Sequence, residues 1–220
     1  MTDVEKIRLL KLLYQYRAIG YEYFEEYRPL IDTKSTIHAH TLDELHTDVM
    51  HCQLCALCKS RKNILFGNGS KEANVMFIGD SPGVSEDETG TLFAGRSGEL
   101  LSRMIENVLL IPKEAVYITT ILKCRPPENR VPTPEEVACC KPYLMQQIEM
   151  VGPKIIVTLG STSFHHLTGE YDTPLEKVRG LVLNFGEAKL IPTFHPSFLL
   201  RNPSAKKEVY ADMLHVRSLL

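Results

Sequence analysis

Apolar residues follow two alternating patterns over most of the chain. Four short apolar runs, each followed by a polar or glycine-containing segment, have the length and composition of buried strands: Asn74–Gly79, Val116–Leu122, Lys154–Leu159 and Lys189–Phe194. Segments with helical spacing lie between and after them: Gly98–Leu109, Pro134–Met150, Thr162–Thr168 and Ala205–Leu220. This alternation predicts an α/β fold, with a central, mostly parallel four-stranded sheet flanked by helices on both faces.

The first 40 residues have a different pattern. Residues 4–28 carry leucines at helical spacing, and Pro29 ends that pattern ahead of a linker that runs to His40. Thr41 and Glu44 then form a capping box that starts a short helix toward Met50. We therefore expect an N-terminal helical extension and linker (1–40), open to a role as an accessory or partner-binding element, and an α/β domain (41–220).

Polar or glycine-containing segments follow each of the four predicted strands directly. They are Gly79–Gly83, Lys123–Pro127, Gly160–Ser161 and His195–Ser197. In open α/β sheets, ligands bind beyond the carboxyl ends of the strands. The sequence therefore predicts that these four segments converge on one cleft.

Composition and charge narrow the classes of protein that fit. The chain has 220 residues, of which 44% are hydrophobic, and a net charge of −2. Its N-terminus lacks the pattern of a signal peptide, and no apolar run approaches the roughly 20 residues that span a membrane. We expect a cytoplasmic protein without a membrane segment and, since no dimer seam is evident, a monomer. Any affinity for nucleic acid must come from a local basic patch.

Six cysteines are the main candidates for binding a metal. Cys52 and Cys55 form a C-x-x-C pair followed by Cys58, and Cys124, Cys139 and Cys140 lie far downstream. In a reducing compartment this spacing favours metal binding over disulfides. Four cysteines suit zinc and an iron–sulfur cluster equally, and buried free thiols remain the alternative.

The ordered motifs around these cysteines resemble the family 4 uracil-DNA glycosylases, the iron–sulfur branch of that superfamily. The resemblance covers residues 41–220. It starts at Cys52-x-x-Cys55-x-Leu57-x-x-x-Arg61 and includes Gly79-Asp80-Ser81-Pro82-Gly83, Tyr117-Ile118-Thr119, Lys123-Cys124-Arg125-Pro126-Pro127-x-Asn129-Arg130 and His195-Pro196-Ser197-x-Leu199-Leu200-Arg201.

This resemblance implies a repair glycosylase that hydrolyses the N-glycosidic bond of uracil in DNA and leaves an abasic site. It also implies a [4Fe–4S] cluster held by Cys52, Cys55, Cys124 and Cys140, with Cys58 and Cys139 as spare cysteines. Asp80 is expected to orient the attacking water or stabilise the sugar cation, and His195 to donate to the departing base. Contacts to the base are expected from Gly79, Ser81, Gly83, Phe93, Thr120 and Ser197. Contacts to DNA are expected from Arg61, Arg125, Arg130, Arg201 and an apolar wedge formed by Phe198, Leu199 and Leu200.

Two positions differ from the family pattern. Asp80 stands where the family usually has glutamate, and Thr120 where it commonly has asparagine. A threonine hydroxyl offers a single short polar group, whereas an asparagine amide both donates and accepts. Two other functions therefore remain open: release of another deaminated base such as hypoxanthine or xanthine, and a non-catalytic iron–sulfur protein that binds DNA.

Overall fold

The computed structural model describes residues 39–220, which belong to one compact unit. The predicted helix within residues 4–28 lies outside the described residues. The short helix expected after Thr41 is present as α2 (Leu42–Met50), and the Thr41 hydroxyl accepts the backbone N–H of Glu44. The predicted capping box forms only in this half, because the Glu44 carboxylate accepts the backbone N–H of His40 and not that of Thr41.

The centre of the fold is a mixed sheet of six strands in the order β1-β3-β2-β4-β6-β5. The four middle strands pair in parallel and coincide with the four predicted apolar runs. They are β2 (Val75–Gly79), β3 (Tyr117–Thr120), β4 (Ile155–Leu159) and β6 (Ala188–Thr193).

The expected count of four strands was wrong, because two short antiparallel strands flank the parallel ones. These are β1 (Asn68–Gly69), which pairs with β3, and β5 (Leu183–Phe185), which pairs with β6. Neither is long enough to show an apolar run in the sequence. Their pairing depends on the neighbouring strand, so only the tertiary structure reveals them.

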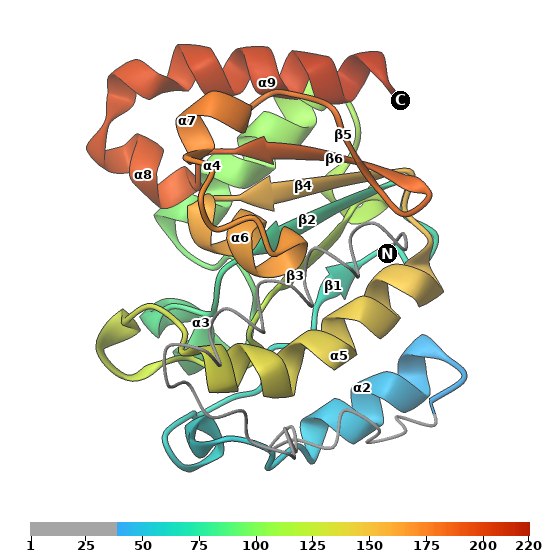
Figure 1. Cartoon of the computed structure of the whole chain (residues 1–220), viewed down its shortest axis with the longest axis vertical. Coiled ribbons are helices and arrows are strands. Elements are labelled where there is room, and N and C mark those ends of the chain that lie inside the picture. Colours follow the sequence, from blue (N-terminus) through green and yellow to red (C-terminus); the bar gives the residue numbers. More distant parts are fainter. Residues whose placement is uncertain (1–38) are drawn as a thin grey trace, which may run out of the picture. The chain divides into compact units, whose positions relative to one another are not determined.

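Helices cover both faces of the sheet, with α6 (Ser161–Thr168) in front of it and α4 (Arg96–Met104) behind it in Figure 1. This arrangement follows from the strand order, because right-handed connections from β2 to β3 and from β3 to β4 run in opposite directions along the sheet. The connecting helix α5 (Pro134–Val151) begins at the capping box of Thr133 and Glu136. The last helix, α9 (Lys206–Ser218), lies along one side of the sheet.

Several shorter helices were not expected from the sequence. The predicted helix at 98–109 is present, because α4 continues directly into a π-helical turn at Ile105–Leu109. Three short helices occupy segments that read as loops: α3 (Val84–Thr89), α7 (Leu175–Val178) and α8 (Pro196–Arg201). Single-turn helices complete the described part of the chain: Ala56–Lys59, Lys113–Ala115, Pro127–Asn129 and Pro203–Ala205.

The core lies between the sheet and its helices. Every residue of β2 and of β4 is buried, as expected for parallel strands covered on both faces. β2 connects to β3 on one side of it in the sheet, whereas β4 connects to β6 on the other side. The chain therefore leaves the carboxyl ends of the neighbouring strands β2 and β4 toward opposite faces. Such a point in a parallel sheet opens a crevice, and this crevice is where the polar segments lie.

Candidate active site and cysteine cavity

A cleft of about 700 Å³ opens at the carboxyl ends of the parallel strands. Gly79 and Asp80 come from the end of β2, Gly160 and Ser161 follow β4, and His195 follows β6. Three of the four predicted segments therefore meet here. The fourth segment, Lys123–Pro127, does not line the cleft, so its predicted convergence there was wrong: Lys123 and Cys124 line a separate cavity. Thr120, which ends β3 ahead of this segment, lines the cleft instead.

The Asp80 carboxylate lies at the amino end of α6. Its Oδ1 accepts the backbone N–H of Ser163, the third residue of that helix, at 2.8 Å. Burial raises the pKa of Asp80 to about 6, and the hydrogen bonds from Ser163 and Thr162 oppose that rise. Asp80 is thus mainly ionised near neutral pH, and these hydrogen bonds hold its carboxylate at the edge of the cleft.

The His195 side chain caps α8. Its Nδ1 accepts the backbone N–H of Ser197 at 3.1 Å and lies 2.7 Å from the Ser197 hydroxyl. A backbone N–H can only donate, so Nδ1 carries no proton and the proton of the neutral ring is on Nε2. Burial and, to a lesser extent, the positive charge of Arg201 lower the pKa of His195 to about 4. His195 therefore offers a neutral Nε2–H donor.

Gly160 separates these two side chains. Its backbone φ is +99°, and a methyl group added there would lie 3.3 Å from Cβ of His195 and 3.6 Å from Oδ1 of Asp80. The absence of a side chain at this position lets a carboxylate acceptor and an imidazole donor approach one another from different strands.

Phe93 provides an aromatic wall. Its ring stacks with that of His195, at 6.0 Å between centroids and 29° between planes, and it covers Gly79. Phe93 has a left-handed backbone with φ of +53°, which is strained for an aromatic residue and typical of functional loops. Gly98 leaves room for this loop, because a methyl group there would lie 1.4 Å from the Phe93 carbonyl oxygen.

Thr120 lines the floor of the cleft, but its hydroxyl is already used. The hydroxyl donates to the Leu122 carbonyl oxygen at 2.6 Å, and the methyl group lies beside Gly79. The side chain therefore has no free donor for a base. The other residues expected to contact a base, Ser81, Gly83 and Ser197, also line the cleft.

Of the side chains expected to contact DNA, some line the cleft and others bind groups within the protein. Arg201 lines the cleft. Arg61 instead donates to Sγ of Cys124 and to the carbonyl oxygen of Cys52, and both terminal nitrogens of Arg130 bind the Glu136 carboxylate. Leu199 is only 1% exposed, so its part in the expected wedge was wrong: a side chain packed in the core cannot enter DNA.

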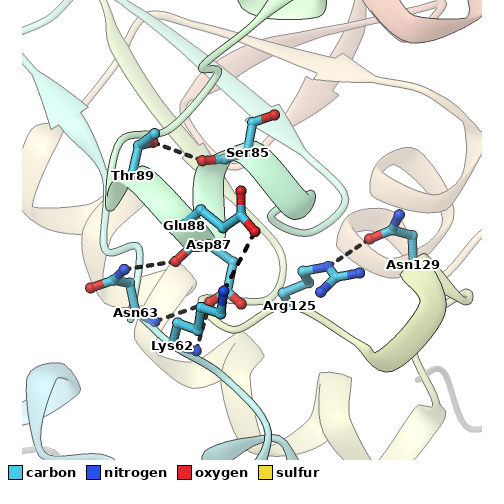
Figure 2. Close-up of polar contacts among 8 residues, drawn as sticks. All are labelled: Lys62, Asn63, Ser85, Asp87, Glu88, Thr89, Arg125 and Asn129. Carbon is cyan, nitrogen blue, oxygen red and sulfur yellow. Dashed lines mark hydrogen bonds and ion pairs between the residues drawn. The ribbon is translucent and has the colours of Figure 1, made fainter.

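Arg125 and the segment after Arg61 are fixed by local hydrogen bonds (Figure 2). Arg125 donates from Nε to Oδ1 of Asn129 at 2.8 Å, which leaves its terminal nitrogens free. The buried carboxylate of Asp87 accepts the backbone N–H groups of Lys62 and Asn63, at 2.9 and 3.0 Å. Asp87 thereby ties the segment after the first cysteines to α3, which follows the Asp80 loop directly.

Some residues of the cleft gave no signal in the sequence or only a weak one. Asn129, for which the sequence predicted no role, lies in the motif that starts at Lys123 and lines the cleft. Its side-chain oxygen accepts from Arg125, and this hydrogen bond does not use its amide nitrogen. Glu86 and His165 also line the cleft, as do the residues at the start of α7. These side chains come from helices and loops whose positions no local pattern determines.

The second cavity is lined by sulfur. Five cysteines surround it: Cys52, Cys55, Cys124, Cys139 and Cys140. All four predicted ligands are thus together, and Cys58 does not line this cavity. Across residues 39–220, no three histidine, cysteine or acidic side chains meet at a point suited to a single metal ion.

Hydrogen bonds distinguish the cysteines in this cavity. Sγ of Cys124 accepts from Arg61, and Sγ of Cys140 accepts from the backbone N–H of Lys123, both at 3.3 Å. Sγ of Cys139 instead donates to the Leu54 carbonyl oxygen, also at 3.3 Å. Donors directed at sulfur suit thiolate ligands, whereas a sulfur that donates keeps its proton. This pattern favours Cys140 over Cys139 as a ligand.

Lys123 adds a buried amine next to the sulfurs. The residue is 1% exposed, and its Nζ donates to Oγ1 of Thr119 at 2.6 Å and to the carbonyl oxygen of Thr120 at 2.7 Å. Burial lowers the pKa of Lys123 to about 7, and the neighbouring Cys140 and Cys124 sulfurs oppose that fall. Negative charge in the cysteine cavity would favour the charged form of this amine, so a negatively charged group there fits these residues.

Comparisons with known proteins identify the family to which the chain is similar. The family model of the uracil DNA glycosylase superfamily matches residues 66–214. The type-4 uracil-DNA glycosylase of Thermotoga maritima is 44% identical over 175 residues, which cover 78% of this chain and 91% of that protein. The type-4 enzyme of Sulfurisphaera tokodaii is 39% identical over 186 residues, covering 81% of this chain and 84% of that protein.

Proposed function

The chain belongs to the uracil DNA glycosylase superfamily, and we propose that it excises uracil from DNA by hydrolysing the N-glycosidic bond. The observation that carries this proposal is the pairing of Asp80 and His195 across Gly160. An ionised carboxylate and a neutral N–H donor, enclosed together in one cleft beside an aromatic ring, are what this hydrolysis requires.

Asp80 acts on the sugar side of the reaction. Cleavage of the bond builds positive charge on the deoxyribose, which an adjacent carboxylate stabilises. The hydrogen bond from Ser163 fixes the carboxylate in position, and the carboxylate orients a water molecule toward the anomeric carbon.

His195 acts on the base side. The departing uracil carries negative charge on its carbonyl oxygens, and the Nε2–H of His195 donates to one of them. Because Nδ1 accepts from Ser197, the tautomer is fixed before substrate binds. A preorganised donor of this kind contributes about 3 kcal/mol to a transition state.

Base recognition rests on stacking and shape. Phe93 stacks on the flipped base, and an aromatic contact of this kind is worth ~1–3 kcal/mol. Thr120 presents a methyl group rather than an amide, so selectivity for uracil depends on other groups in the cleft. This feature keeps a second substrate open, namely another deaminated base such as hypoxanthine or xanthine.

The cysteine cavity is the proposed site of a [4Fe–4S] cluster, with Cys52, Cys55, Cys124 and Cys140 as ligands. The hydrogen bonds to Cys124 and Cys140 and the buried Lys123 amine beside these sulfurs support this assignment. When bound, such a cluster serves as a structural anchor. The chain's own residues connect it to the cleft: Arg61 binds the cysteine segments, and Asp87 binds the segment that follows.

DNA enters through contacts to the remaining basic residues. Arg201 at the cleft and the free nitrogens of Arg125 are the proposed phosphate contacts, while Arg61 and Arg130 act within the protein. Leu200, 43% exposed and adjacent to Arg201, is the proposed wedge. No helix in the described part of the chain has the length and apolar character to cross a membrane. A cytoplasmic location, a monomeric state and a partner for residues 1–40 stay predictions.

A single-turnover assay tests the proposed function. Oligonucleotides that contain uracil, hypoxanthine or xanthine are incubated with excess protein, and the released base is measured. Release of uracil, abolished or strongly slowed by Asp80→Asn, is the expected result. If protein with its cluster intact releases no base from any of the three, the chain is not a glycosylase for these lesions.

A further inference from the structure

A basic groove lies next to the cleft, between α4 and α8. It has a volume of about 240 Å³ and is lined by Arg96, Glu99, Leu100, Arg103, Leu200 and Lys206. Arg96, Leu100 and Arg103 follow one another at helical spacing and so share one face of α4. This face borders the end of α8 and the start of α9.

The charges in this groove are not neutralised by the protein. Within residues 39–220, Arg96, Arg103 and Lys206 have no ion pair, and Glu99 is the one acidic side chain that lines the groove. By contrast, Arg130 and Arg179 bind carboxylates. Three positive charges against one negative charge form a surface that attracts an anion.

Arg96 is also poorly placed for the stability of its own helix. It is the first residue of α4, where the helix dipole disfavours a positive charge. Arg103 lies seven residues later on the same face, about 10 Å further along the helix axis. The two arginines therefore span more than one phosphate of a nucleic-acid strand.

The groove and the cleft share a border. Leu200 lines the groove and Arg201 lines the cleft, although they are consecutive residues of α8. A nucleotide flipped into the cleft past Leu200 stays covalently joined to its neighbours, so its strand has to continue past this border. The groove begins at this border, next to Leu200.

We propose that the α4–α8 groove binds the phosphate backbone of the DNA strand that carries the flipped nucleotide. Arg96, Arg103 and Lys206 contact phosphates on one side of the lesion, while Leu200 fills the space that the flipped base leaves. The inference rests on the proposed function for the presence of DNA in the cleft. It assigns to this groove a contact that extends beyond the damaged nucleotide.

The salt dependence of DNA binding tests the groove. Affinity for a fluorescent duplex two helical turns long and without uracil is measured between ~50 and ~200 mM salt, where each phosphate contact contributes about 0.9 to the slope of log K against log salt. Replacing Arg96, Arg103 and Lys206 together by glutamine should reduce that slope by about 2 to 3. The matched control replaces Lys113, Lys154 and Lys189 by glutamine, since these lie toward the opposite end of the parallel strands.

Two further readouts separate this proposal from the proposed function. On a uracil-containing duplex at saturating protein, the groove variant should release base at the wild-type rate, because it leaves the cleft intact. On a trinucleotide with uracil, which offers only the phosphates next to the lesion, KM should differ less between variant and wild type than on the duplex. Equal salt slopes for the groove and control variants would overturn the proposal that the groove binds DNA, even if the wild-type protein releases uracil. A reduced slope in the groove variant, together with no base release by the wild-type protein, would support DNA binding in the groove and contradict the proposed glycosylase activity.

Discussion

The carboxylate of Asp80 accepts the backbone N–H of Ser163 at 2.8 Å, although 83 positions separate these residues in the chain. The bond joins the end of β2 to the first turn of α6, on opposite sides of the crevice in the sheet. It fixes Oδ1 of the carboxylate at the edge of the cleft. The same enclosure that positions Asp80 also raises its pKa, and this connects the geometry to a measurable pH dependence.

The rate of base release should rise with pH through an apparent pKa of about 6. The pKa of Asp80 is raised to about 6 by burial, and the ionised form is the active one, so activity is lost as pH falls below that value. His195, with a pKa near 4, stays neutral over this range. Single-turnover rates of base release between about pH 4.5 and about pH 8, a range that extends to both sides of this pKa, measure the pH–rate profile. Asp80→Asn should be slow at every pH; a profile unchanged by this substitution would assign the titration to another group.

The raised pKa also has a consequence for stability. Folded Asp80 holds its proton more tightly than the unfolded chain, whose value is near 3.8. Its contribution to stability is therefore fully present below pH 4 and is lost as pH rises through 6. Asp80→Asn removes the buried charge, so its unfolding midpoint relative to wild type should increase between pH 5 and pH 7, as thermal melts can measure.

Replacing His195 by alanine should slow base release by about 10²–10³-fold, as typical for loss of one preorganised donor. Affinity for uracil-containing DNA should change little. Ser197→Ala is the matched control: it removes the hydroxyl but keeps the backbone N–H that fixes the tautomer, so its effect on the rate should be much smaller. An equal loss of rate in both variants would show that the hydroxyl itself is the essential group.

Gly98→Ala should disable the enzyme through the Phe93 loop. The added methyl group would lie 1.4 Å from the Phe93 carbonyl oxygen, so the loop must move away from the cleft. We expect weaker substrate binding and slower release in kinetic assays, with the fold retained by circular dichroism. Gly186→Ala, where nothing lies within 4 Å but φ is +57°, should cost stability and leave the kinetics unchanged.

Two substitutions at Thr120 test its role in base selection. Thr120→Val keeps the shape but leaves the Leu122 carbonyl oxygen without its donor, so stability should fall by about 1–3 kcal/mol in denaturant unfolding. The ratio of uracil to hypoxanthine release should stay at the wild-type value. Thr120→Asn should raise this ratio, because it adds a donor and an acceptor. A loss of selectivity in Thr120→Val would mean that the hydroxyl turns toward the base.

Serine substitutions should distinguish ligands from spare cysteines. Cys124→Ser and Cys140→Ser should lower the iron and sulfide content per chain and the broad visible absorbance of the purified protein. Cys58→Ser and Cys139→Ser should keep both, because Cys58 does not line the cavity and Cys139 donates its thiol proton to Leu54. Loss of the cluster in Cys139→Ser but not in Cys140→Ser would exchange their assignments.

The sequence by itself determined the features that depend on local periodicity and chemistry. The four parallel strands are continuous apolar runs because both of their faces are buried, and the starts of α2 and α5 carry their caps within four residues. The positions of Asp80, Gly160 and His195 at strand ends placed them at one edge of the sheet. The family motifs added the ligand set, of which all four cysteines line one cavity.

Only the tertiary structure decided which partner each side chain takes. Arg61 and Arg130 read as free basic residues, yet one binds the cysteine segments and the other binds Glu136. Leu199 and Leu200 are chemically identical neighbours, and only packing against the core buries the first and exposes the second. The Thr120 hydroxyl turns away from the cleft because the Leu122 carbonyl oxygen accepts it. Each of these outcomes depends on atoms brought close by folding, which no periodicity along the chain records.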